Sequence, residues 1–164
     1  MKTIIIIRHA KSSWQSTVLT DFDRALNNQG LKDAKLMGKV LASRKINLDM
    51  IISSTANRAI TTAKIIANQI QFKDKIREEK KIYGASSKEL FDIIIRLNSN
   101  INSIALVGHN PALHILSEML SNEKFPKFPT CSVVKINFTI NSWDLIQRGN
   151  LEYFLFPKSN NLFI

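Results

Sequence analysis

An arginine and a histidine follow a run of apolar residues near the start of the chain. Four consecutive isoleucines, Ile4 to Ile7, lead directly into Arg8 and His9. An uninterrupted isoleucine run predicts a strand that is buried on both faces of a sheet. In open α/β sheets the reactive groups lie at the carboxyl ends of the strands. Arg8 and His9 are therefore candidate active-site residues. The alternative is that they are merely the first solvated residues after a core strand.

Two later strands end in side chains of the same kinds. The apolar stretch at residues 49–53 is followed one helical turn later by Arg58, and the stretch at residues 104–107 runs into Gly108 and His109. If these strand ends lie side by side, two guanidinium groups and two imidazoles converge with the amino-terminal ends of helices. Guanidinium groups and helix N-termini both bind phosphate oxygens. This combination predicts a site for a tetrahedral dianion.

The sequence has neither a Walker A loop nor a recognisable carboxylate cluster for magnesium or zinc. Phosphoryl transfer without a metal needs a protein nucleophile and positive charge around the equatorial oxygens. A histidine can be that nucleophile if its attacking nitrogen is neutral, and the other ring nitrogen is then expected to donate to a backbone carbonyl. We therefore expect a reaction that needs no metal and no cofactor.

The apolar periodicity predicts the elements that would position these residues. A polar loop should lead from Trp14 to Asn28, followed by helices at residues 28–44, 56–70, 88–98 and 111–120 and further strands at 76–83, 132–137 and 151–156. The expected N-caps are Ser54 or Thr55, Ser87 and Asn110, with Pro111 in the first helical position. His114 lies off the apolar stripe of its helix and is expected at the surface.

The order of these elements indicates the fold class. The last two strands are joined by a short connection and should be antiparallel. The earlier strands alternate with helices, which is typical of a parallel sheet covered on both faces. We therefore expect a single domain over residues 1–164 with an α/β, three-layer αβα fold, whose mostly parallel sheet carries an antiparallel element.

The chain is strongly basic, with a net charge of +10 and a pI near 9.9. Acidic residues interrupt its one basic cluster, at residues 73–81, so the pattern favours a solvated surface over a nucleic-acid groove. A positive face would still attract an anionic substrate or an acidic protein. No apolar run is long enough to span a bilayer, and the N-terminus lacks the features of a signal peptide. The single cysteine, Cys131, cannot form an internal disulfide and is expected to be buried. These features predict a cytoplasmic protein.

Four motifs in a fixed order carry a resemblance to a known family. They are Arg8–Trp14 (RHAKSSW), Asp21–Leu26 (DFDRAL), Arg58–Ala63 (RAITTA) and Val107–Pro111 (VGHNP). Together they resemble the histidine phosphatase superfamily, also called phosphoglycerate-mutase-like, and within it the small SixA-type phosphohistidine phosphatases. The resemblance covers essentially the whole chain. It therefore implies a single histidine-phosphatase domain with a phosphoglycerate-mutase-like fold.

The resemblance also implies roles for individual residues. His9 would be the nucleophile that becomes phosphorylated, Arg8 and Arg58 would clamp the phosphoryl oxygens, and His109 would donate to another oxygen. Arg24 would add a substrate contact, with its guanidinium held by Asp21.

The implied substrate is a phosphorylated protein, such as a histidine-phosphotransfer domain or a phosphorelay carrier, and the enzyme is expected to be a monomer. Two alternatives remain open. One is a phosphatase of a small phosphorylated metabolite, and the other is a non-catalytic module that binds phosphate or nucleic acid. Turnover of a generic phosphate ester or phosphoramidate would distinguish the enzymes from the binding module.

The sequence departs from many mutase-like members in one respect. Those members use a carboxylate to protonate an alkoxide leaving group, and the chain offers only Glu78 or Glu79 near the corresponding region, without a supporting motif. An alkoxide needs that proton. A leaving imidazole, whose conjugate acid titrates near pH 6.5, needs it less. The missing acid therefore favours a substrate with a phosphorus–nitrogen bond.

Overall fold

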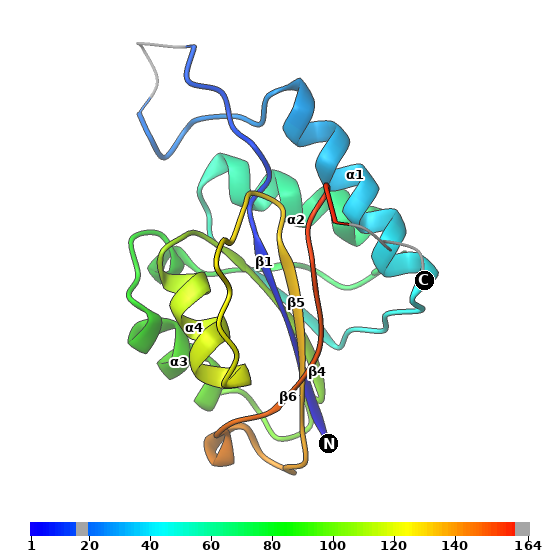
Figure 1. The fold of residues 1–164 in the computed structure, drawn as a ribbon, viewed down its shortest axis with the longest axis vertical. Helices are drawn as coiled ribbons and strands as arrows, with labels where there is room; N and C mark the ends of the chain where they lie inside the picture. Colours follow the sequence, from blue (N-terminus) through cyan, green and yellow to red (C-terminus); the bar gives the residue numbers. More distant parts are fainter. Residues whose placement is uncertain (16–19, 160–164) are drawn as a thin grey trace.

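The computed structural model describes residues 1–15 and 20–159, so part of the polar loop expected before Asn28 lies outside the described residues. A six-stranded sheet forms the centre of the molecule (Figure 1). Its strands are β1 (Lys2–Arg8), β2 (Met50–Ser53), β3 (Arg77–Glu78), β4 (Ser103–Gly108), β5 (Val133–Phe138) and β6 (Asn150–Leu155). The helices are α1 (Asn28–Ser43), α2 (Asn57–Gln69), α3 (Ser87–Ile95) and α4 (Ala112–Ser121), and two short 3-10 turns are η1 (Lys80–Ile82) and η2 (Trp143–Leu145).

The sheet is mixed, with the strand order β3-β2-β4-β1-β5-β6. The first four strands in this order are parallel, whereas β5 pairs antiparallel with both β1 and β6. Helices α1 and α2 cover one face of the sheet, and α3 and α4 cover the other (Figure 1). These observations confirm the predicted α/β, three-layer fold. No helix in the described ranges is long and apolar enough to cross a membrane.

Strand β1 is buried on both faces, as its isoleucine run predicts. The side chains of Ile4 and Ile6 enter the apolar core under α3 and α4, and those of Ile5 and Ile7 enter the core under α1 and α2. All four residues are at most 1% exposed. The backbone of β1 is paired on both edges, by β4 and β5. The residues that follow β1 are thus attached to a strand that is enclosed on both faces and both edges.

The carboxyl ends of β2, β4 and β1 lie side by side. Arg8 is in register with Gly108, and Ser53 is in register with Val107. The residues that follow these strands are linked as well, because the His9 N–H donates to the Gly108 carbonyl at 3.0 Å. This arrangement confirms the prediction that three buried strands deliver their ends to one place.

Three of the predicted helix starts are shifted. Helix α3 is capped by Ser86 rather than Ser87, because Ser86 and Glu89 form a reciprocal capping box. Helix α2 has Ala56 at its N-cap position without a side-chain bond. Helix α4 has Pro111 at its N-cap position, because the Asn110 side chain donates to the Phe128 carbonyl instead of accepting from the helix.

The predicted edge strand at 76–83 is much shorter than expected. Only Arg77 and Glu78 pair with β2. The next residue, Glu79, accepts the Lys81 N–H on its side chain at 3.3 Å and thereby caps η1. A local cap of this kind competes with continued strand pairing. The chain therefore turns at Glu79 and carries Tyr83 back toward the strand ends.

Candidate active site

His9 lies immediately beyond β1 and is 8% exposed. Its Nδ1 atom lies 2.7 Å from the Ala10 carbonyl oxygen. A carbonyl only accepts hydrogen bonds, so Nδ1 carries the proton and Nε2 keeps its lone pair. The expected backbone partner is thus Ala10. Burial, with the nearby Arg58 and Arg8 charges, lowers the pKa of His9 from 6.5 to about 4, against the opposing effect of the Ala10 bond. His9 is therefore neutral at pH 7, with Nε2 available as a nucleophile.

Arg58 lies in the first turn of α2 with its guanidinium beside that nitrogen. Its Nε donates to His9 Nε2 at 3.3 Å. Its two terminal nitrogens donate to the Asp21 backbone carbonyl at 2.6 Å and to the Asp21 carboxylate at 3.1 Å. The residue is only 5% exposed. A buried cation at the start of a helix opposes the helix dipole, and Asp21 offsets this cost.

His109 follows β4, and its ring centroid lies 5.1 Å from that of His9. Its Nε2 lies 2.8 Å from the Ser54 hydroxyl. That hydroxyl also accepts the Ala56 N–H at 3.2 Å, and with its hydrogen and a second lone pair left it can either donate to His109 Nε2 or accept from it. Nδ1 of His109 is buried without a partner among the described residues, and it carries the ring proton when Ser54 donates to Nε2. Burial and the neighbouring His9 lower the pKa of His109 to about 3, so the ring is neutral.

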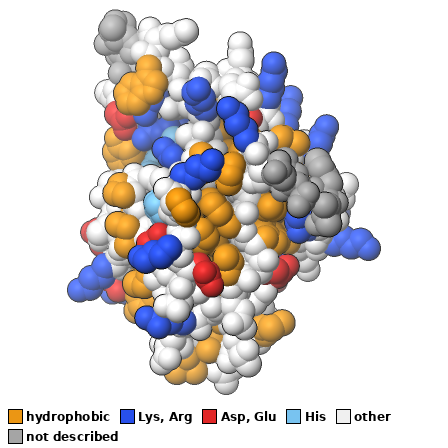
Figure 2. Space-filling model, viewed as in Figure 1, with side chains coloured by type: hydrophobic (Ala, Val, Ile, Leu, Met, Phe, Trp, Pro, Cys, Tyr) orange, Lys and Arg blue, Asp and Glu red, His pale blue; other side chains and the backbone are white. Residues whose placement is uncertain are grey.

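The structure places Arg8, His9, Arg58 and His109 around one cavity of about 430 Å³. The other lining residues are Lys11, Ser12, Trp14, Arg24, Asn110 and Thr130. Three buried polar atoms of this lining have no partner among the described residues, namely Arg8 Nε, His109 Nδ1 and Asn110 Oδ1. Buried polar atoms are normally paired, so their grouping here indicates a polar ligand. Figure 2 shows Lys and Arg side chains gathered around the histidine atoms on this face.

Arg24 also lines the cavity, and Asp21 holds its guanidinium at 3.0 Å. A second nitrogen of Arg24 donates to the Ser12 hydroxyl at 2.7 Å. Most of its donors are therefore bound within the protein. The Trp14 ring lies over the same guanidinium, with the ring centroid 3.6 Å from the central carbon.

Comparison with known proteins identifies the family. A model of the histidine phosphatase superfamily (branch 1) matches residues 4–82, which include His9 and Arg58. A structure assigned as the phosphohistidine phosphatase SixA of Agrobacterium tumefaciens is 27% identical, with a TM-score of 0.81 and coverage of 94% of this chain and 97% of that one. The chain belongs to the histidine phosphatase superfamily. Its fold is of the SixA type, and this membership implies a phosphatase.

Further relatives of this histidine phosphatase extend over most of its length. An uncharacterized chloroplastic protein of Arabidopsis thaliana is 29% identical over 87% of this chain and 69% of that protein. An uncharacterized protein of Mycobacterium tuberculosis is also 29% identical, over 87% of this chain and 93% of its own length. The protein histidine phosphatase SixA in complex with tungstate has the same fold, with a TM-score of 0.77 at 19% identity.

Tyr83 is a site neighbour of this histidine phosphatase that sequence reasoning missed. Its hydroxyl donates to the Asp21 carboxylate at 2.7 Å, and its ring meets His109 edge-on with the centroids 5.6 Å apart. This bond, assisted by Arg58 and Arg24, lowers the pKa of Asp21 to about 2. No motif points to Tyr83, because its position depends on the turn at η1.

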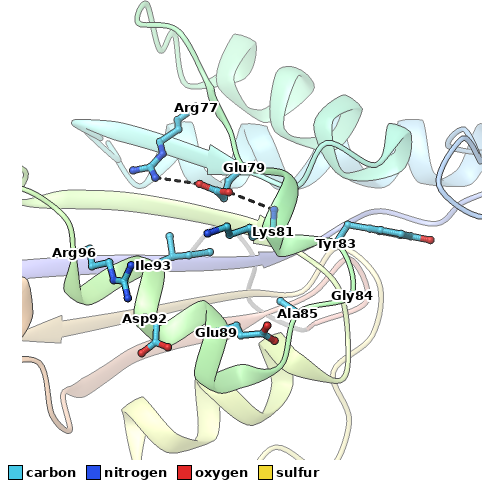
Figure 3. Close-up of a pocket in the computed structure, with 10 residues that line it drawn as sticks. All are labelled: Arg77, Glu79, Lys81, Tyr83, Gly84, Ala85, Glu89, Asp92, Ile93 and Arg96. Atoms are coloured by element: carbon cyan, nitrogen blue, oxygen red, sulfur yellow. Dashed lines mark hydrogen bonds and ion pairs between the residues drawn. The ribbon is translucent and has the colours of Figure 1, made fainter.

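Neither Glu78 nor Glu79 lines the catalytic cavity. Glu79 forms an ion pair with Arg77 at 3.1 Å and lines a separate cavity of about 480 Å³ beside α3. Figure 3 shows this pair, with Tyr83 pointing away from the other lining residues. Within the described part of the chain, no group of three or more histidine, cysteine or acidic side chains is placed to hold a metal ion.

Two other residues lie outside the catalytic group. Cys131 is fully buried, as expected, directly behind the site, where its N–H donates to the His9 carbonyl at 3.1 Å. His114 is only partly exposed, although the sequence predicts a surface position. Its side chain is 28% exposed, stacks on Phe128 and has Nε2 2.8 Å from the Phe125 carbonyl. The aromatic loop after α4 covers it, which the helical periodicity alone does not indicate.

Proposed function

We propose that this histidine phosphatase removes phosphoryl groups from phosphohistidine in a partner protein, through a phosphoenzyme on His9. The observation that carries the proposal is the state of His9, a neutral imidazole fixed by Ala10 with Nε2 beside Arg58. The implied partner is a histidine-phosphotransfer domain or a phosphorelay carrier, as the SixA-like fold suggests.

In the first step, His9 Nε2 attacks phosphorus and the phosphorus–nitrogen bond of the substrate breaks. The leaving nitrogen keeps the bonding electron pair, and its ring departs as neutral imidazole when the other ring nitrogen is already protonated. His9 becomes a phosphorylated imidazolium, which the Nδ1–H bond to Ala10 stabilises. In the second step, water attacks phosphorus, His9 leaves as a neutral ring, and the proton of the water passes to the released phosphate or to solvent.

The other side chains stabilise the transferred group. Arg58 lies beside the nucleophilic nitrogen, and Arg8 and His109 each have a buried nitrogen without a partner in the part of the chain that the structure describes. Guanidinium donors suit the equatorial oxygens of a phosphoryl group in transfer, and so does His109 Nδ1 in the tautomer that carries the proton there. Arg8 would be fixed for this role by its bond to the Phe128 carbonyl at 2.7 Å.

The lack of a general acid in the cavity favours a substrate with a phosphorus–nitrogen bond over a phosphate ester. The described lining of the catalytic cavity includes no carboxylate. Asp21, whose carboxylate pairs with Arg24 and Arg58, has a pKa of about 2 and is ionised at neutral pH, so it has no proton to give. An ester would leave as an alkoxide that needs a general acid, whereas an imidazole leaves without one.

A small phosphorylated metabolite is the second candidate substrate. The cavity of about 430 Å³ falls in the size range of small-molecule sites. The two candidates are separated by kcat/KM for a phosphohistidine protein, phosphoramidate, nitrophenyl phosphate and sugar phosphates. The proposal expects the phosphohistidine protein to rank first, and a sugar phosphate ranking first would favour the metabolite.

The phosphoenzyme is tested by alkaline quenching of a reaction with labelled substrate. We expect a base-stable, acid-labile label on the peptide that contains His9. His9→Ala should abolish both label and turnover, whereas His109→Ala should slow labelling without moving the label, because His109 stabilises the group rather than attacking it. Label on His109, or full turnover without His9, would contradict this mechanism.

A further inference from the structure

Trp14 lies at the rim of the catalytic cavity with most of its side chain exposed. It is 79% exposed, whereas His9 and Arg58 in the same cavity are 8% and 5% exposed. The phosphoryl chemistry therefore takes place in the buried part of the cavity, and Trp14 lies outside it. A group that contacts Trp14 must belong to whatever carries the phosphoryl group.

The indole is held in place although it is exposed. One of its faces lies 3.6 Å above the Arg24 guanidinium, and Arg24 is fixed in turn by Asp21 and Ser12. Stacking of this kind stabilises an exposed aromatic ring by about 0.5–1 kcal/mol. The other face of the ring has no such neighbour among the described residues. A partner that covers this face buries a large aromatic surface at a small cost in side-chain entropy.

The charge around the cavity indicates what kind of surface fits there. Its described lining has four cationic residues, Arg8, Lys11, Arg24 and Arg58, and no carboxylate. Lys11 is exposed and also lines the neighbouring cavity, together with Lys127 and Lys158. A partner surface with carboxylates around its phosphorylated residue is complementary to this ring of cations.

We propose that Trp14 is a docking anchor for the phosphorylated partner protein, packing against an apolar patch that is bordered by carboxylates near the phosphohistidine. Tryptophan and arginine are the residue types that dominate the energy of protein interfaces. The inference rests on the proposed function, because it assigns the surface that selects a protein over a small substrate.

The test compares substrates that share the phosphoryl chemistry but differ in size. They are phosphoramidate, a phosphohistidine peptide of about ten residues, and the folded histidine-phosphotransfer domain from which the peptide is taken. We expect Trp14→Ala to raise KM for the folded domain at least tenfold with little change in kcat. Its effect on kcat/KM for the folded domain should exceed its effect for phosphoramidate by at least tenfold, with the peptide in between.

Two further variants sharpen the result. Trp14→Phe keeps an aromatic ring and should recover most of the loss, and Lys11→Glu should raise KM for the folded domain in a salt-dependent way. Leu145→Ala is the matched control, because Leu145 is an exposed apolar side chain outside the lining of the catalytic cavity. Leu145→Ala should leave kcat and KM unchanged for all three substrates.

The outcomes separate the inference from the proposed function. If Trp14→Ala slows phosphoramidate as much as the folded domain, Trp14 acts on the chemistry and the docking proposal is wrong, while the phosphatase assignment stands. If Trp14→Ala leaves kcat/KM unchanged for all three substrates, the docking proposal is also wrong. If the unmodified enzyme prefers a sugar phosphate to every phosphohistidine substrate, it is the proposed function that fails.

Discussion

Asp21 is the residue that connects Arg24 and Arg58. Its carboxylate accepts from Arg24, Arg58 and the Tyr83 hydroxyl. The sequence predicted the contact with Arg24, three residues away, from a short motif. The contacts with Arg58 and Tyr83 join residues 37 and 62 positions apart, and they depend on how loops meet above the sheet. No periodicity encodes such a meeting, which is why sequence reasoning missed them.

The role of Asp21 can be tested by Asp21→Asn, which removes its charge and keeps its shape. We expect kcat/KM for phosphoramidate to fall about 10- to 100-fold, because small displacements of positioning groups have effects of this size. Asp23→Asn is the matched control, since Asp23 is also exposed to solvent and its carboxylate bonds Thr20 rather than an arginine. Near-normal kinetics of Asp21→Asn would show that Arg58 needs no anchor.

At the scale of elements, the positions of the strands explain what the sequence could predict. Arg8 ends strand β1, and His9 and His109 directly follow buried strands, which are the most recognisable feature of the sequence. The predicted helix starts were less accurate. Ser54 and Asn110 have side chains that suit an N-cap, but Ser54 bonds His109 and Asn110 donates to the Phe128 carbonyl instead. A side chain in a functional site is often diverted from its local role.

Helix α1 supports the segment behind the nucleophile through a close backbone approach. A Cβ atom on Gly30 would lie 2.0 Å from the Lys11 carbonyl oxygen, which also accepts the Asn27 N–H at 3.0 Å. The obstacle is backbone rather than a flexible side chain. Any larger residue at this position would therefore displace either α1 or the segment that follows His9.

We expect Gly30→Ala to destabilise the protein by about 1–3 kcal/mol, as for overpacking, although alanine is the better helix former. It should also lower kcat/KM, because the displaced segment adjoins His9. Urea unfolding and phosphoramidate kinetics measure the two effects. Lys32→Ala, at an exposed position of the same helix, should change stability by less than about 0.5 kcal/mol. A fully stable and active Gly30→Ala protein would refute the close approach.

For the whole molecule, the buried neutral histidines link folding to pH. The pKa of His9 is about 4 in the folded state against 6.5 for an ordinary histidine. Below pH 6.5 the unfolded chain therefore binds a proton that the folded chain does not. Stability from this group is complete above pH 6.5 and is lost as the pH falls toward 4. His109, with a pKa of about 3, acts in the same direction.

This linkage predicts how the stability of a variant without the His9 imidazole should depend on pH. Between pH 7 and pH 5, the free energy of unfolding of His9→Gln should rise relative to the wild type by about 2 kcal/mol. Urea unfolding of both proteins at the two pH values measures the change. Leu145→Ala has no titrating group and should keep a constant difference from the wild type. A constant difference for His9→Gln would mean that His9 titrates normally in the folded protein.

The division between strand ends and loops has a consequence for how such an enzyme diversifies. The nucleophile is held by β1, a strand that is buried on both faces, whereas Trp14 and Tyr83 lie on surface connections. Connections tolerate substitution and insertion far better than a buried strand does. Substitutions in the connections at the rim of the cavity can therefore change which phosphorylated substrate binds. The residues that transfer the phosphoryl group stay the same.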